Sequence, residues 1–104
     1  MSEMTVGEEL ESWSGQNADR LRRTGLAVEF GRGPEDRPNR VVWINLESSD
    51  RIGELLLWTS GEVELGTSNR ATGTVQQEHH HVKSFCDLQP LLAHLEHLMT
   101  SAVP

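Results

Sequence analysis

Apolar and polar residues alternate along the chain with two different periods, which predict a helix, a run of strands and a second helix. Between Thr5 and Gly25 the apolar positions recur every three or four residues, as on one face of a helix over residues 5–24. This predicted apolar face consists of Val6, Leu10, Trp13, Ala18 and Leu21. The run from Thr5 to Glu8 matches a capping box, and Gly25 suits the left-handed conformation that ends a helix.

The central part of the chain has the period of two that is typical of half-buried strands. Strands are predicted over residues 26–31, 40–46, 52–59, 62–67 and 74–82. Ser60-Gly61 has the length and chemistry of a two-residue hairpin turn. This turn would place Leu56 and Trp58 opposite Leu65 and Val63 on the core face. The second face would then carry Leu55, Leu57, Glu62 and Glu64.

The last element is predicted to be an amphipathic helix over residues 87–100. Leucine and other apolar residues lie along one side of it, and Asp87 as N-cap would place Pro90 in the first turn, where a missing N–H matters little. The strand before it, residues 74–82, is almost wholly polar and therefore suits a sheet edge. The predicted fold is a single α+β domain over residues 1–104. It has an N-terminal helix, a mainly antiparallel meander of about five strands, and a C-terminal amphipathic helix.

Composition narrows the classes of function. The 104 residues carry 16 acidic and 9 basic side chains, a formal net charge of −7, which disfavours direct binding to nucleic acid and favours basic protein partners. The longest apolar run, residues 55–58, is far too short to span a membrane. The start of the chain lacks the pattern of a secretory signal, and Cys86 has no second cysteine to pair with. We therefore expect a cytoplasmic protein.

The sequence offers few groups for catalysis. His79, His81, His94 and His97 would form a metal site only if the fold brought a strand and a helix together around one ion, and we interpret them as solvated side chains. Cys86 has no recognisable oxyanion hole or orienting group beside it in the sequence, and is interpreted as a packing residue. We expect no enzyme activity, no metal and no cofactor, with the four histidines kept as the alternative.

Trp43 is the most informative aromatic residue, because it points to the face of its strand that is opposite the predicted core. With Leu55 and Leu57 it would form an apolar centre on the second face of the sheet, flanked by Glu62 and Glu64. Either a helix covers this face, or the face binds a partner through an apolar centre and an acidic rim. We favour the interpretation that a helix covers it.

Several segments of the chain are similar to one known family. Residues 43–48, 52–65 and 71–73, together with His80, resemble the TriTu family of bacterial immunity proteins, and the most specific piece is the run from Leu57 to Glu62. The likeness extends to nearly the whole chain in the order of elements. It implies a small α+β protein that binds a cognate toxin and blocks it, and it supplies no catalytic residues.

The resemblance and the charge together define a predicted contact surface. Its residues are Trp43, Leu55, Leu57, Glu62 and Glu64 on the sheet, with Arg32, Glu35 and Asp36 in the loop over residues 31–39. The expected partner is a cognate toxin with a basic surface. Two other functions stay open, an acidic adaptor or secretion chaperone and a histidine-dependent metal-binding protein. A homodimer through the exposed strand edge also stays open.

Overall fold

The computed structural model describes residues 4–100 and contains two helices and five strands in the predicted order. The elements are α1 (Val6–Arg23), β1 (Ala27–Arg32), β2 (Val41–Glu47), β3 (Arg51–Trp58), β4 (Glu62–Asn69), β5 (Val75–His81) and α2 (Phe85–Thr100). The two ends of the predicted domain, residues 1–3 and 101–104, lie outside the described residues. The α+β class and the element order are therefore confirmed.

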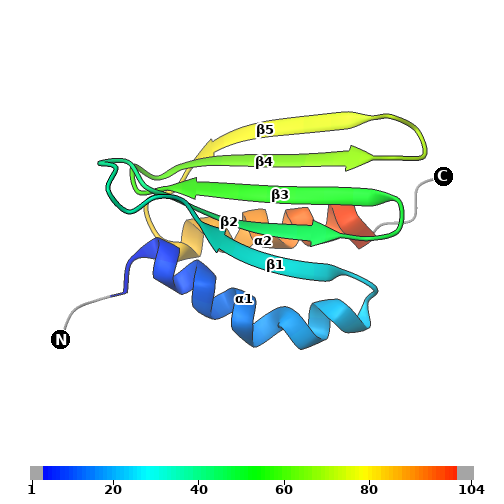
Figure 1. Ribbon diagram of the computed structural model, residues 1–104, viewed down its shortest axis with the longest axis horizontal. Coiled ribbons are helices and arrows are strands. Elements are labelled where there is room, and N and C mark those ends of the chain that lie inside the picture. The colour runs from blue at the N-terminus through cyan, green and yellow to red at the C-terminus, as the bar shows by residue number, and fades with distance from the viewer. Residues whose placement is uncertain (1–3, 101–104) are drawn as a thin grey trace.

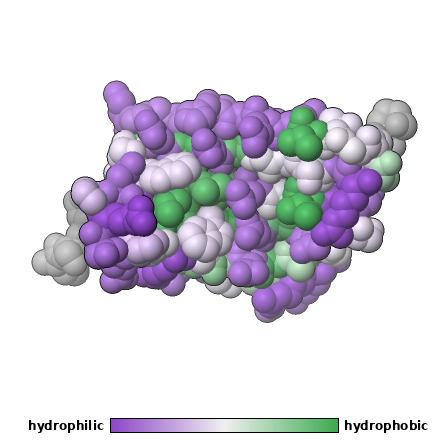
Figure 2. Space-filling view, turned by 45° about the horizontal axis from the view of Figure 1, so that its top comes forward, coloured by the Kyte–Doolittle hydropathy of each residue, from purple (hydrophilic) through white to green (hydrophobic). Residues whose placement is uncertain are grey.

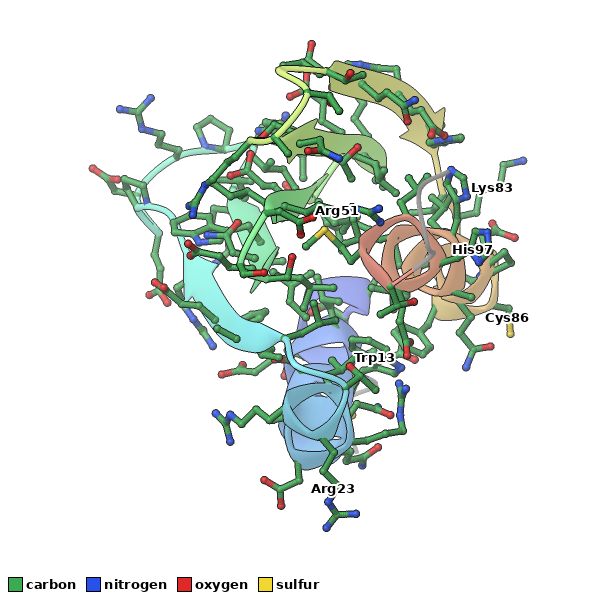
Figure 3. All side chains as sticks on the ribbon, turned by 90° about the vertical axis from the view of Figure 1, so that its right-hand side faces the viewer. Trp13, Arg23, Arg51, Lys83, Cys86 and His97 are labelled. Carbon is green, nitrogen blue, oxygen red and sulfur yellow. The ribbon has the colours of Figure 1, made fainter. Side chains whose placement is uncertain are left out.

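The five strands form one open antiparallel sheet in the order β1-β2-β3-β4-β5, so each strand pairs with its neighbours in sequence. Both helices lie on the same side of this sheet (Figures 1 and 3). α1 packs beside β1, and α2 packs on β3 and β4. The opposite face carries no helix among the described residues, which corrects the expectation that a helix covers it.

The first helix begins and ends as its sequence predicts. The Thr5 hydroxyl accepts the N–H of Glu8, and the Glu8 carboxylate accepts the N–H of Thr5, so the capping box is present. Gly25 has a φ of +91°, in the left-handed region that L side chains avoid. Leu10 and Leu21 on the predicted apolar face are fully buried, and Val6 and Trp13 pack against the core.

The hydrophobic core lies between the sheet and the two helices. Alternate residues of the central strands point into it: Ile44, Leu46, Leu55, Leu57, Val63 and Leu65. From α2 the core receives Leu88, Leu92, Leu95 and Met99. Each of these side chains is at least 96% buried, so this layer supplies most of the apolar burial that stabilises the fold.

The turn between β3 and β4 is one residue longer than predicted, and this reverses the faces of β3. Leu57 pairs with Val63 and Leu55 pairs with Leu65, so the connection is a three-residue loop, residues 59–61. Gly61 has a φ of +95°, which fits the left-handed third position of such a loop. Because side chains alternate along a strand, the shift sends Leu55 into the core and Leu56 out of it. The predicted register was wrong for this hairpin.

The second helix begins at Phe85, two residues before the predicted N-cap. Asp87 lies in the first turn, where its carboxylate accepts the N–H of Lys83 from the segment before the helix. Pro90 is therefore inside the helix. It cannot donate to the carbonyl one turn earlier, but that carbonyl belongs to Cys86 at the exposed start of the helix, where water can serve as donor.

Gly53 and Arg51 allow α2 to pack closely against β3. A Cβ atom at Gly53 would lie 2.7 Å from the sulfur of Met99 and 2.9 Å from a methyl carbon of Leu95, so the missing side chain makes room for the helix. Arg51 is 8% exposed, and its Nη1 donates to the carbonyl oxygen of Leu98 at 2.7 Å (Figure 3). A cation at the last turn of a helix also interacts favourably with the helix dipole.

Candidate functional site

The uncovered face of the sheet carries an apolar patch at one end, which Figure 2 shows among hydrophilic side chains. We name this the open-face patch and define it as Val41, Trp43, Leu56 and Trp58. Trp43 pairs with Leu56 and Val41 pairs with Trp58 across β2 and β3, so the four side chains form a square on two adjacent strands. All four are half-buried. They present apolar area to solvent on a surface that no described helix covers.

Two glycines at the end of β1 and just after it make room for side chains of the open-face patch. A Cβ atom at Gly31 would lie 2.5 Å from Cε2 of Trp43, and one at Gly33 would lie 2.8 Å from a methyl carbon of Val41. Any side chain at Gly31 would therefore push the indole off the sheet. The missing side chain at Gly31 thus leaves room for the indole of Trp43, and the one at Gly33 leaves room for Val41.

Carboxylates border the open-face patch on the side of β4. Glu64 pairs with Leu56, and its Oε1 lies 3.6 Å from Nδ1 of His79 on β5. Glu62 follows the β3–β4 loop on the same face as Glu64 and has no ion pair among residues 4–100. The predicted combination of Trp43 with Glu62 and Glu64 on one face is therefore present.

Two members of the predicted contact surface do not lie on the open face. Leu55 and Leu57 are 0% and 3% exposed and lie in the core, because the three-residue loop puts them on the helix side of β3. Their places on the open face are taken by Leu56 and Trp58. The sequence signal for this register is the glycine at position 61, because three-residue hairpin loops typically have glycine at their third position. Gly61 adopts the left-handed conformation that this position requires.

A hollow of about 660 Å³ adjoins the patch at the end of the sheet, and it is lined by residues of the β1–β2 loop, the β3–β4 loop, the start of α1 and the segment between β5 and α2. Its apolar lining includes Val42, Leu57, Trp58 and Val82. Charged side chains of both signs surround its mouth: Glu8, Glu11, Arg32, Glu35, Arg40 and Lys83. The hollow extends the open-face patch around the end of the sheet.

The predicted loop residues lie at different places around this hollow. Arg32 lines it and forms an ion pair with Glu11 of α1, and its Nη1 lies 3.9 Å from Oε1 of Glu35. Glu35 also lines the hollow, whereas Asp36 is exposed and is not part of its lining. Arg32 is thus occupied by contacts with Glu11 and Glu35, whereas Asp36 has no ion pair among the described residues.

The four histidines of the alternative metal site do not come together. His79 and His81 are on the open face of β5, whereas His94 and His97 are on α2, on the other side of the sheet. No group of three or more potential ligands suitable for a metal ion occurs within residues 4–100. Figure 3 shows His97 and Cys86 on α2 directed away from the sheet, and Cys86 is exposed. The geometry gives this alternative no support.

A different histidine cluster, which the sequence pattern did not predict, joins β5 to α2. The Oε1 atom of Glu78 lies 3.0 Å from Nε2 of His80, and its Oε2 atom lies 2.8 Å from Nε2 of His94. Glu78 and His80 point to the helix side of β5, because they pair with the core residues Leu65 and Val63 of β4. The hydrogen bonds from His80 and His94 lower the pKa of Glu78 below its ordinary value.

Replacing Glu78 by glutamine will lower stability in a pH-dependent way. Because the pKa of Glu78 is lower in the folded than in the unfolded state, its ionised form stabilises the fold above about pH 4.5. This contribution disappears as the pH falls through the lowered pKa. Since the carboxylate is one-third exposed, the difference between wild type and Glu78→Gln should be about 0.5–1 kcal/mol at pH 6. Urea unfolding at pH 6 and pH 3 measures it, and a gap that is the same at both pH values would contradict the assignment.

The architecture places the chain among small α+β proteins that keep one face of an antiparallel sheet uncovered. Residues 8–97 match the model of the family described as immunity protein TriTu, so most of the chain is covered and the chain belongs to this family. Membership in that family supports an immunity function. No curated protein matches the sequence. None of the described helices is long and apolar enough to cross a membrane.

Proposed function

We propose that the protein neutralises a cognate toxin by binding it through the open face of its sheet. The observation that carries this proposal is the open-face patch, in which two indoles and two aliphatic side chains meet on a surface that no described helix covers. Aromatic residues at the centre of a patch, with a polar rim, are typical of protein interfaces. The family provides the class of partner, a toxin.

The acidic rim suggests how the toxin is recognised. Glu62 and Glu64 border the patch, and the chain has a net charge of −7. Carboxylates around an apolar centre attract a basic surface and speed its approach, while the centre provides the desolvated contact. The partner we propose is therefore a toxin domain with a basic surface, bound in the cytoplasm of the producing cell. Covering that surface would block the toxin without any reaction by the immunity protein.

Reversing two charges on the rim tests this proposal. The Glu62→Lys/Glu64→Lys variant should bind the toxin at least about 10-fold more weakly at low salt, because two attractive contacts become repulsive. Its affinity should also fall less with added salt than that of wild type. Isothermal titration calorimetry from about 50 to 500 mM salt against the cognate toxin measures both effects.

A matched control separates a local effect from the change in net charge. Asp19→Lys/Asp50→Lys alters the net charge equally at exposed positions, on α1 and in the β2–β3 turn. We expect it to bind almost as wild type does. Equal affinities of wild type and the Glu62/Glu64 variant would remove the acidic rim from the proposed interface. A complex in which the toxin stays active would indicate an adaptor or chaperone rather than an inhibitor.

A further inference from the structure

The free edge of the sheet at β5 has the properties of a pairing surface. β5 is the last strand of the sheet and pairs with β4 alone among the described residues, and no element lies beyond it in Figure 1. The strand Val75–His81 contains no proline and no lysine, and its pairing with β4 is regular over all seven residues. Proline, lysine, bulges and inward-pointing charged residues are the usual means by which proteins prevent pairing at such edges. Of these, β5 has only the inward-pointing Glu78, which is hydrogen-bonded to His80 and His94 within the chain.

The hydrogen-bond pattern shows which backbone groups are available at this edge. The N–H of Val82 donates to the carbonyl of Gly61, and the N–H of Asn69 donates to that of Thr74. These bonds lie at the two ends of the β4–β5 ladder. They show that the even-numbered residues of β5 direct their N–H and C=O groups toward β4. The N–H and C=O groups of Val75, Gln77, His79 and His81 therefore point to the free edge.

We propose that this edge pairs with β5 of a second copy of the chain, antiparallel, with the two-fold axis at His79. In this register each His79 faces the other His79, and Gln77 faces His81 of the second copy. All of these residues have their backbone groups directed outward, so each pair can exchange two hydrogen bonds. The result would be one continuous sheet across two copies, with both open-face patches on the same side.

The side chains that face each other favour this register over the one centred on Glu78. With the axis at His79, Glu78 of each copy faces His80 of the other, so carboxylates and imidazoles alternate across the junction. Moving the axis to Glu78 would place two carboxylates directly opposite each other, which is destabilising. The negative net charge of each copy opposes association over long distances, but at about 0.15 M salt the Debye length is only about 8 Å.

Proline at position 79 tests the pairing with a closely matched control. His79→Pro removes the imidazole and the outward N–H without affecting the bonds to β4, whereas His79→Thr removes the imidazole and keeps the N–H. Sedimentation velocity at pH 7.5 and about 0.15 M salt should show a dimer for wild type and His79→Thr. The dimer dissociation constant of His79→Pro should be at least 10-fold higher than that of wild type. Circular dichroism and the melting temperature check that this variant folds.

Cysteine cross-linking tests the register independently, in a Cys86→Ser background. His79→Cys should form a disulfide-linked dimer in a glutathione buffer, because the Cα atoms of a hydrogen-bonded pair are about 5.5 Å apart, within disulfide range. Gln77→Cys should not cross-link, since its equivalent in the second copy lies four residues further along the strand.

Three results would overturn the proposal. The first is a monomeric wild type at concentrations up to about 1 mM, the second a His79→Pro variant that dimerises as wild type does, and the third cross-linking at position 77 but not at position 79. If wild type is a monomer and His79→Pro loses toxin binding while His79→Thr keeps it, the edge binds the toxin and not a second copy of the chain. Because the dimer does not depend on the open-face patch, its failure would leave the proposed function unaffected.

Discussion

Truncating Leu55 to alanine will lower the free energy of unfolding by about 2–5 kcal/mol, whereas the same change at Leu56 will lower it by less than about 1 kcal/mol. The two residues are neighbours on β3 and chemically identical, but Leu55 is 0% exposed among core side chains and Leu56 is half-buried on the open face. Removing three carbons from a packed core leaves a cavity, whereas solvent fills the space on an open surface.

Chemical denaturation of the two variants under identical conditions measures this difference. It tests the register of the β3–β4 hairpin directly, because a two-residue loop would exchange the two results. Equal losses at both positions would mean that the open face is covered in solution. A larger loss at Leu56 than at Leu55 would contradict the pairing of Leu55 with Leu65.

Replacing Trp58 by alanine will weaken binding to the toxin by about 30- to 1,000-fold, which corresponds to about 2–4 kcal/mol. Trp58 is part of both the open-face patch and the lining of the neighbouring hollow, so its ring lies where the two surfaces meet. A partner that covers this point would desolvate the whole indole, and such central aromatic residues contribute most of the energy of an interface.

Two further variants make the Trp58 experiment specific. Trp58→Phe should retain most of the affinity, because it keeps an aromatic ring on the same strand. Gln89→Ala, an exposed change on α2 on the other side of the sheet, should bind as wild type does. Surface plasmon resonance gives the affinities, and growth of cells that co-express the toxin shows whether protection follows them. Wild-type affinity for Trp58→Ala in a folded protein would exclude the open-face patch as the centre of the interface.

Much of the fold could be predicted because its signals are local. The capping box at Thr5, the glycine after α1 and the change from a helical to a strand period depend on residues within one turn or one strand of each other. The polar composition of β5 likewise indicated an edge strand, and β5 is an edge. The family resemblance drew mainly on residues 43–65, and the match over residues 8–97 confirms it.

The candidate site was only partly predictable, because it depends on register and on contacts between distant residues. Trp43, Glu62 and Glu64 were placed together correctly, since each faces away from the core on its own strand. Leu56 and Trp58 were missed because one extra loop residue reverses every side chain of β3. The predicted start of α2 was two residues too late, because Asp87 was expected to be the N-cap. In the structure Asp87 lies in the first turn, and its carboxylate accepts the N–H of Lys83.

The sequence by itself determined the order and type of the elements and the acidic charge, because these follow from neighbouring residues and from composition. Only the tertiary structure decided that both helices pack on one face and leave the other open. It also decided that Arg51 binds the last turn of α2 and that Glu78 joins two histidines from different elements. These features form only when the chain closes loops of tens of residues, and the pattern of residues along a single element carries no information on them.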